Sequence, residues 1–287
     1  MFAIFKRELR SYFTGMTGYV VLAVSLAFLG LYYTSQNLLY GSPDFGGVLY
    51  TCTLIMLFML PAVTMRSFAE ERHSKTDQLL LTAPVSIPQI VLGKYLAELA
   101  VFGISCAVAA LMPLLLTRFG TVSLTAAYAV LFAYFLLGAA CLAVGTWVSA
   151  QTENQIIAYL AAFGLLLVAY LMNGIRSMIS SGNLLAFGVF MVVVLVAAIV
   201  VGVLCKNLAA GCGVFCAGAV ALFVVFWLRP TWLLTAFNAA LQAVALFEPF
   251  FDVVGGMFSL NTVLYYLSAV GLFLFLTGQT LERRRWN

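Results

Sequence analysis

The sequence has 287 residues, of which 14 are Lys or Arg and 10 are Asp or Glu, so charged residues make up only 8%. Soluble domains carry about 25% charged residues, whereas hydrophobic residues reach 64% here and the mean hydropathy is +1.09. This composition excludes a soluble globular domain and a disordered chain, because neither stays in water with so little charge. The net charge of +4 is too small to indicate a nucleic-acid partner.

The N-terminal segment, residues 1–15, is amphipathic. Its apolar side chains recur at helical spacing and are Phe2, Phe5, Leu9, Tyr12 and Phe13. Three cations stand between them, namely Lys6, Arg7 and Arg10. The pattern predicts an interfacial helix with its apolar face in lipid and its cations near the headgroups.

Long apolar runs separated by short polar breaks then predict an all-α membrane protein, because a β-barrel would show alternating segments of about ten residues. Eight runs approach or exceed the roughly 20 residues that a spanning helix needs. They are residues 16–36, 46–65, 92–116, 125–149, 156–175, 184–204, 208–228 and 259–281.

The distribution of cations predicts the orientation of these spans. With the N-terminus in the cytoplasm, eleven of the 14 Lys and Arg residues fall inside, and only Arg118, Arg176 and Arg229 fall outside. Cytoplasmic loops of membrane proteins carry the excess of such cations. Both termini are therefore expected to be cytoplasmic.

Residues 66–89 form the one substantial cytoplasmic loop that this topology predicts. The loop concentrates charge in Arg66, Glu70, Glu71, Arg72, Lys75 and Asp77, and it holds the only histidine, His73. Ser74 and Asp77 resemble a capping box and predict a short helix over Lys75–Thr82, which Pro84 ends. This helix would carry an apolar patch, Leu79, Leu80 and Leu81.

A second helix start follows in the same loop. Ser86 with Gln89 has the spacing of a capping box, and Pro88 is tolerated in a first helical turn. The helix is expected to run directly into the third span. Such a charged helical elbow indicates contact with another protein; the alternative is a solvated loop with accidental caps.

Ionisable residues inside the spans would indicate ion or proton transport. Lys94 and Glu98 stand at the start of the third span, and their spacing of four residues predicts that they pair with each other near the interface. The six cysteines and nearby methionines suggest helix packing, with a soft-metal path as the alternative. No metal site is expected.

Enzymatic motifs are missing from the sequence. It contains no G-x-x-x-x-G-K-[ST] phosphate-binding loop, and its single histidine excludes intramembrane proteases that need histidines within spans. We therefore expect no catalytic residue in this chain.

Residues 231–258 are apolar but interrupted by polar residues and glycines, including Glu248 and Asp252. If this segment crossed the membrane, the C-terminal Arg283–Arg285 cluster would end up outside. We interpret it as one or two short re-entrant helices in the outer leaflet, covered by protein. An external amphipathic helix is the alternative.

Two segments resemble a known family. Met65–Arg72, which reads MRSFAEER, and Thr76–Val85, which reads TDQLLLTAPV, resemble the cytoplasmic loop of ABC-2-type transporter permeases. They are most similar to the gliding-motility-type branch, whose loop typically reads M-R-x-F-A-E-E-R and then T-x-E-L-L-L-T-x-P-V. The tail from Val263, ending in LERRRW, also resembles that branch. The branch's acidic position after the threonine is shifted here, to Asp77.

The resemblance implies a six-helix core like that of type V exporters, with 1–15 as the connecting helix and 66–89 as the coupling loop. Residues 231–258 would be the external re-entrant helices, and 176–230 an extra transmembrane hairpin inserted into the core. The contact with the ATPase would then be made by Arg66, Glu70, Glu71, Arg72, Asp77, Leu79, Leu80 and Leu81.

The resemblance also implies the partners. A separate ABC ATP-binding subunit would bind ATP and Mg²⁺, and a second permease subunit, identical or related, would complete the complex, with an auxiliary membrane or extracytoplasmic subunit as a further candidate. The expected setting is the bacterial cytoplasmic membrane, and the expected function is export of an unidentified substrate. The alternatives are a mechanical or assembly scaffold that transports nothing, and a secondary transporter, which the uncharged span interiors disfavour.

Overall fold

The computed structural model describes residues 1–76, 85–179 and 245–286, together with the single positions 191, 235, 239 and 242. The chain divides into unit 1, Met1–Val168 with Phe247–Asn287, and unit 2, Ala169–Leu246. Apart from position 191, the predicted spans 184–204 and 208–228 lie outside the described residues, as does almost all of the predicted hairpin at 176–230. Asp77 and Leu79, Leu80 and Leu81 also lie outside them.

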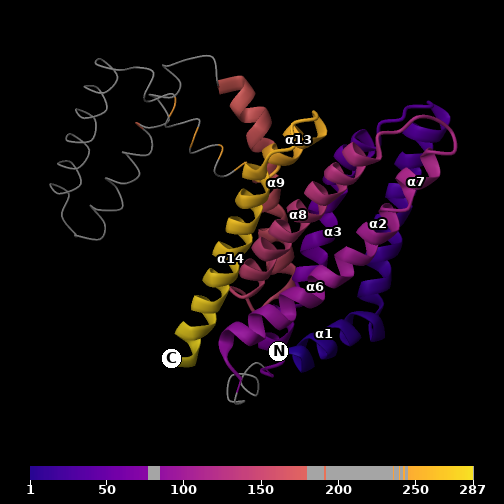
Figure 1. Ribbon diagram of the computed structural model, residues 1–287. Helices are drawn as coiled ribbons and strands as arrows, with labels where there is room; N and C mark the ends of the chain where they lie inside the picture. The colour runs from indigo at the N-terminus through magenta and orange to yellow at the C-terminus, as the bar shows by residue number, and fades with distance from the viewer. Residues whose placement is uncertain are drawn as a thin grey trace. The chain divides into compact units, whose positions relative to one another are not determined.

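Six described helical segments are long and apolar enough to cross a membrane (Figure 1). They are Met16–Leu39, Phe45–His73, Ile87–Leu116, Leu124–Ser149, Gln155–Met172 and Leu260–Arg285. Each coincides with one of the predicted spans, and every regular element in the described part of the chain is helical. The prediction of an all-α multi-pass membrane protein is therefore confirmed.

The N-terminal half of unit 1 begins with the amphipathic helix α1 (Phe2–Thr14) and the spanning helix α2 (Met16–Tyr33). A π-helical segment, η1 (Thr34–Leu39), continues α2 and ends it. There the buried Asn37 amide donates to the backbone carbonyls of Ser42 at 2.7 Å and Asp44 at 3.1 Å. Asp44 then caps α3 (Phe45–Thr64), because its Oδ1 accepts from the Gly46 amide at 2.9 Å.

After α3 come the short helix α4 (Ala69–His73), the long helix α6 (Ile87–Ala109) and the short α7 (Met112–Leu116). α6 starts directly after Ser86 with Pro88 in its first turn, where a missing backbone N–H costs nothing. This confirms the predicted helix start and its continuation into the third span. Ser86 makes no side-chain capping bond, so the capping box itself is not formed.

The rest of the described chain consists of α8 (Leu124–Ser149), α9 (Gln155–Ile179), the short α13 (Glu248–Val254) and α14 (Leu260–Trp286). α13 lies within the predicted segment 231–258 and packs on α3 and α8. Its neighbour Phe247 and its own Phe250 are fully buried. The structure has this short helix ahead of the last span, and of residues 231–244 it describes only 235, 239 and 242, so the re-entrant arrangement stays a prediction.

α8 is the central helix of unit 1, packed against α3, α6, α13 and α14 (Figure 1). Small residues allow this close approach, as they do in other membrane bundles. A Cβ added at Gly145 would overlap the Thr64 side chain of α3, and one at Gly138 would overlap the Phe102 ring of α6. These glycines set how closely the three helices approach.

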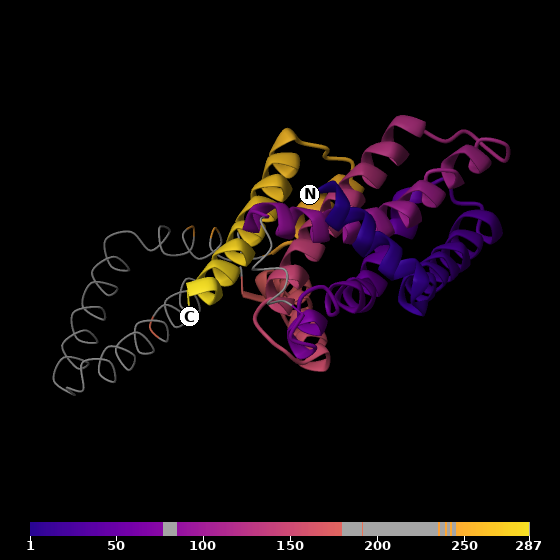
Figure 2. The ribbon, with the colours of Figure 1, turned by 90° about the horizontal axis from the view of Figure 1, so that it is seen from below.

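Within unit 1, α1 and the C-terminal end of α14 lie at the same end of the bundle, whereas α7 and α13 lie at the other (Figure 1). Seen from below, α1 crosses the ends of the spanning helices (Figure 2). The described residues between α3 and α6, 65–76 and 85–86, reach this same end. The described part of the predicted coupling loop, the connecting helix and the C-terminal end of α14 are therefore brought together.

Candidate functional site

Lys94 is a buried cation at the end of the bundle where α1 lies. It sits on the second turn of α6, and only 1% of its side chain is exposed. Its Nζ donates to the Ser67 carbonyl at 2.7 Å and lies 3.0 Å from Glu71 Oε2 and 3.2 Å from Glu8 Oε1. A buried charge is tolerated only with such partners, so these contacts hold α1, α4 and α6 together.

Arg7 completes the cluster from its outer side. Its Nη2 lies 2.6 Å from Glu8 Oε1 and 2.8 Å from Glu71 Oε1. Each of the two carboxylates is thus shared between two cations, one buried and one half exposed. We call the four side chains Arg7, Glu8, Glu71 and Lys94 the ionic cluster. Because the cations and carboxylates balance, the cluster buries no net charge.

The short helix α4 is anchored at its N-terminus by α8. Ser149 Oγ, at the end of α8, accepts from the amides of Phe68 and Ala69, both at 3.2 Å. These are free amide groups of the kind that a helix start must satisfy. The side chain that does so comes from a residue some 80 positions away, so the α4 start is fixed to the central helix.

Two arginines tie the α4 segment to further elements. Arg66 makes a bidentate pair with Glu70, at 2.7 and 3.0 Å, and its Nη1 donates to Thr17 Oγ1 at 2.9 Å at the start of α2. Arg72 Nη2 lies 2.9 Å from Glu153, in the turn between α8 and α9. Every charged residue from 66 to 72 therefore has an ionic partner within the chain.

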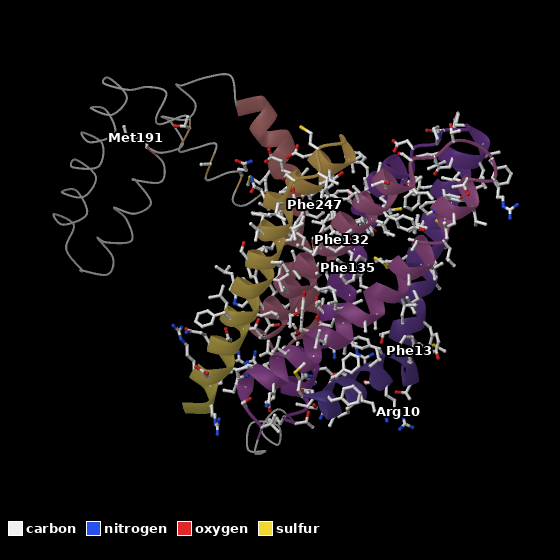
Figure 3. All side chains as sticks on the ribbon, in the orientation of Figure 1. Arg10, Phe13, Phe132, Phe135, Met191 and Phe247 are labelled. Carbon is white, nitrogen blue, oxygen red and sulfur yellow. The ribbon has the colours of Figure 1, made fainter. Side chains whose placement is uncertain are left out.

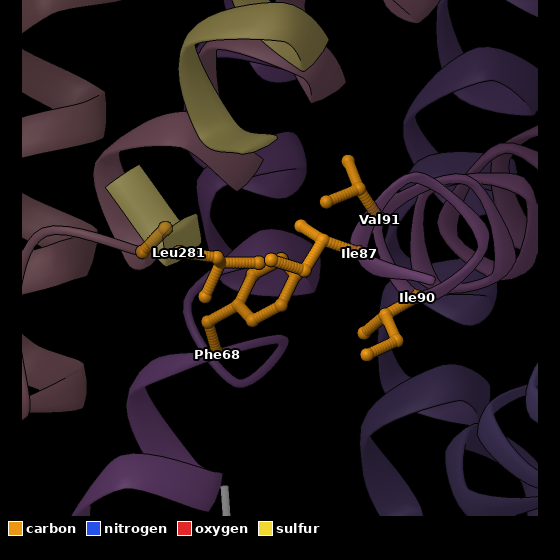
Figure 4. Close-up of a cluster of buried hydrophobic side chains, with 6 residues drawn as sticks. Phe68, Ile87, Ile90, Val91 and Leu281 are labelled. Carbon is orange, nitrogen blue, oxygen red and sulfur yellow. The ribbon is translucent and has the colours of Figure 1, made fainter. Parts of the chain in front are cut away.

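An apolar cluster lies beside these polar contacts (Figure 4). Phe68 packs with residues from the start of α6, the end of α8 and the end of α14, and the buried members are Phe68, Ile87, Ile90, Val91, Ala150 and Leu281. Arg284 adds a hydrogen bond to the Gln151 carbonyl at 3.3 Å. The C-terminal end of α14 thus belongs to the same assembly as α4.

Part of the apolar face of α1 packs on protein. Tyr12 is buried, and its hydroxyl donates to the Val63 carbonyl of α3 at 3.0 Å. Ile4 packs on Gly93 of α6, where an added Cβ would come within 3.0 Å of it. Burial raises the pKa of Tyr12, which keeps its hydroxyl a donor. Of the other predicted apolar side chains, Phe5, Leu9 and Phe13 are half-buried and Phe2 is 76% exposed, so the contact of this face with lipid stays a prediction.

The three predicted cations of α1 differ in their roles. Arg7 belongs to the ionic cluster, whereas Lys6 and Arg10 are exposed. Figure 3 shows Arg10 on the outer side of α1. Their predicted contact with lipid headgroups remains an expectation.

Two local contacts differ from the prediction. Ser74 does not cap a helix start, because α4 ends at His73 and the Ser74 hydroxyl donates back to the Glu70 carbonyl at 2.9 Å; residues 77–82 of the predicted helix lie outside the described residues. Lys75 has a left-handed φ of 56°, so the chain turns there. Lys94 does not pair with Glu98, because its ion pairs are to Glu8 and Glu71. At Lys94, contacts across helices outweigh the local spacing.

Sequence reasoning missed several members of this site. The sequence pattern gave no role to Glu8, Ser149 or Glu153. Glu8 contacts the buried cation Lys94, whereas Ser149 and Glu153 contact the α4 segment. A signal existed for Glu8, since it is the one acidic residue of a basic helix and lies on the face of Phe5 and Tyr12. Ser149 and Glu153 had no such signal, because their partners are distant in sequence.

The predicted external residues lie apart from this site. Glu248 and Asp252 stand on α13, at the other end of unit 1 (Figure 1). The described cysteines, Cys52, Cys106 and Cys141, are buried free thiols on three different helices. No group of three or more His, Cys, Asp or Glu residues among the described positions is arranged to hold a metal ion.

Comparison with known families gives this arrangement a context. Residues 9–183, well over half of the 287, match the ABC-2 family transporter protein family, and comparison with curated proteins finds no match. Proteins of this family are the membrane components of ABC transporters, are not themselves ATPases, and work with an ABC ATP-binding partner. With its apolar spanning helices and this match, the chain belongs to the ABC-2 family of transporter membrane proteins.

Proposed function

We propose that the chain is the permease subunit of an ABC exporter in a bacterial cytoplasmic membrane, and that a separate subunit hydrolyses the ATP. Both termini are cytoplasmic in this proposal, and the ATP-binding subunit, with its ATP and Mg²⁺, docks on residues 66–89. A second permease subunit completes the transport pathway. The loop and tail motifs support the gliding-motility-type branch.

The observation that carries this proposal is the fixing of α4 to four other helices. The ionic cluster ties it to α1 and α6, the Arg66–Thr17 contact ties it to α2, and Ser149 ties it to α8. A displacement of the coupling loop would therefore move the ends of several spanning helices together. Rigid-body movement of this kind is a common way of converting a local push into a global change.

The burial of the predicted contact residues divides them into two groups. Glu71 and Arg72 are mostly buried, with 19% and 12% of their side chains exposed, and both are held by partners within the chain. Glu70 is 44% exposed, and residues 73–76 are exposed. We therefore assign Glu70, Lys75, Asp77 and the patch Leu79, Leu80 and Leu81 to the ATPase surface. Arg66, Glu71 and Arg72 transmit the movement behind it.

Two further elements complete the proposal. Lys6 and Arg10 on the outer side of α1 contact anionic headgroups, which fixes the connecting helix at the membrane surface. α13 with Glu248 and Asp252 belongs to the external re-entrant segment and closes the opposite end of the subunit.

Co-purification with its ABC ATP-binding subunit tests the docking assignment. We expect Glu70→Lys combined with Leu80→Ala to abolish complex formation and the stimulation of ATP hydrolysis. Asp252→Lys is the matched control, because it reverses an exposed acidic charge at the other end of unit 1 and should leave both unchanged. Intact complex formation by the double variant would show that the ATPase docks elsewhere.

Reconstitution of the complex in vesicles tests the output. ATP-dependent movement of a solute or lipid supports the exporter. Active hydrolysis by an intact complex without any such movement would favour the alternative, a mechanical or assembly scaffold driven by the same type of ATPase.

A further inference from the structure

Glu98 is a fully buried carboxyl group that has no part in the proposed transmission of movement. It lies on α6, one turn beyond Lys94 and roughly 16 Å along the helix from Ile87, and none of its surface is exposed. Ionised carboxylates are almost never buried in this way without a cation or several hydrogen bonds. Its surroundings therefore decide its protonation state.

The hydrogen bonds of Glu98 are incomplete for a carboxylate. Oε2 accepts from Thr146 Oγ1 of α8 at 2.8 Å, while Oε1 has no hydrogen-bond partner. The adjacent Ser67 hydroxyl, at the junction of α3 and α4, is also buried and is the one polar side chain beside Oε1. The Ser67 hydroxyl can donate to Oε1, and a protonated Oε1 can donate to the hydroxyl oxygen, so a proton can be held between the two atoms.

Among the described residues, no cation forms a salt bridge with Glu98. The charged and titratable groups around it are Lys94 and Tyr95 of α6, and Glu8 and Tyr12 of α1. Lys94 is the only cation in that set, and its ammonium group is bound by Glu8, Glu71 and the Ser67 carbonyl. Glu8 adds a negative charge nearby. A neutral Glu98 fits these surroundings and an ionised one does not.

We propose that Glu98 is a proton-binding site, and that its bound proton keeps Lys94 on the ionic cluster. If the proton leaves, the new carboxylate attracts Lys94, which stands one helical turn away and on the same face of α6. Lys94 then leaves Glu8 and Glu71, and the tie between α1, α4 and α6 weakens. Ser67 links the two states, since its carbonyl binds Lys94 and its hydroxyl faces Glu98.

The proton site can be tested on the purified full-length chain, without any ATPase. We expect the infrared spectrum at neutral pH to contain the carbonyl band of a buried protonated carboxyl group, and Glu98→Gln to remove it. The exposed Glu282→Gln is the matched control and should leave the band in place. Ser67→Ala should shift the band without removing it, because the acceptor of the proton is lost.

Thermal unfolding against pH gives a second readout. The folded chain holds a proton that the unfolded chain releases as pH rises, so the unfolded state gains stability and the wild-type melting temperature falls. As pH rises, the melting temperature of Glu98→Gln should fall less than that of the wild type. The melting temperature of Glu282→Gln should follow the wild type. If Glu98→Gln does not fold, the response of the band to Ser67→Ala still decides.

The absence of a protonated-carboxyl band, a band that Ser67→Ala leaves unmoved, or equal pH dependence of wild type and Glu98→Gln would overturn the proton site. Only the mechanical consequence of proton release, the weaker tie between α1, α4 and α6, rests on the proposed function. A failed docking experiment would therefore leave the proton site standing, and a missing band would leave the docking assignment standing.

Discussion

The ammonium group of Lys94 lies 3.0 Å from Oε2 of Glu71, and this contact joins the third membrane span to the short helix that precedes it at the end of the bundle. Lys94 is buried, whereas Glu71 is also reached by Arg7 from α1. The pair therefore stands at the meeting point of three helices. Its strength should depend on the burial of Lys94 rather than on the charge of the loop as a whole.

Glu71 and Glu70 offer a matched comparison. Glu71→Gln removes a charged partner from a buried cation, and such losses cost about 3–5 kcal/mol. Glu70→Gln breaks a partly exposed pair with Arg66 and should cost about 1 kcal/mol or less. Thermal unfolding of the two purified variants measures the difference. Equal destabilisation would show that the cluster around Lys94 carries no special weight.

Ser149 should act as a cap for a helix that is far from it in sequence. Ser149→Ala leaves the amides of Phe68 and Ala69 without an acceptor and should destabilise the protein by about 1–2 kcal/mol. Ser86→Ala is the control, because Ser86 precedes α6 without making a side-chain capping bond. A loss at Ser86 as large as that at Ser149 would contradict this assignment.

Leu281 should stabilise the assembly from the C-terminal end of α14. It is 6% exposed and packs in the cluster with Phe68, so Leu281→Ala should cost about 2–4 kcal/mol. Leu272, on the same helix, is 56% exposed, and Leu272→Ala should cost little. Unfolding temperatures in detergent compare the two. Similar losses would mean that the end of α14 does not support α4.

Gly145 should tolerate no side chain while Thr64 is present. Gly145→Ala places a methyl group where the Thr64 side chain lies, so the variant should be destabilised by about 1–3 kcal/mol. Adding Thr64→Ala to the same chain should restore part of the loss, because it removes the overlapping atoms. A double variant less stable than the sum of the single changes would contradict the proposed contact between α3 and α8.

The spans could be predicted from the sequence because their signal is local. In lipid, an apolar run of the required length has to form a hydrogen-bonded helix. The predicted bounds of α3 and α8 therefore lie within one residue of the observed bounds. The start of α6 was also predicted from a local signal, because Pro88 is tolerated only in the first turn of a helix. The resemblance at Met65–Arg72 added the family.

The contacts of the candidate site could not be predicted in the same way. Spacing favoured a pair between Lys94 and Glu98, but the choice of partner depends on where α1 and α4 lie, and those positions follow from packing. The same holds for α1, whose amphipathic pattern fits a lipid surface and a protein surface equally well. Ser149 carries no local signal of its role, because its partners are separated from it by the length of two spans.

The central claim is that Lys94 links the docking of the ATPase to the spanning helices. It is tested most directly by ATP hydrolysis in the complex of the Lys94→Gln variant with its ATPase, with the exposed Arg118→Gln, next to α7 at the other end of unit 1, as a check on the loss of one cation. We predict that Lys94→Gln still binds the ATPase but no longer stimulates its ATP hydrolysis. Wild-type stimulation by a folded Lys94→Gln complex would contradict the account.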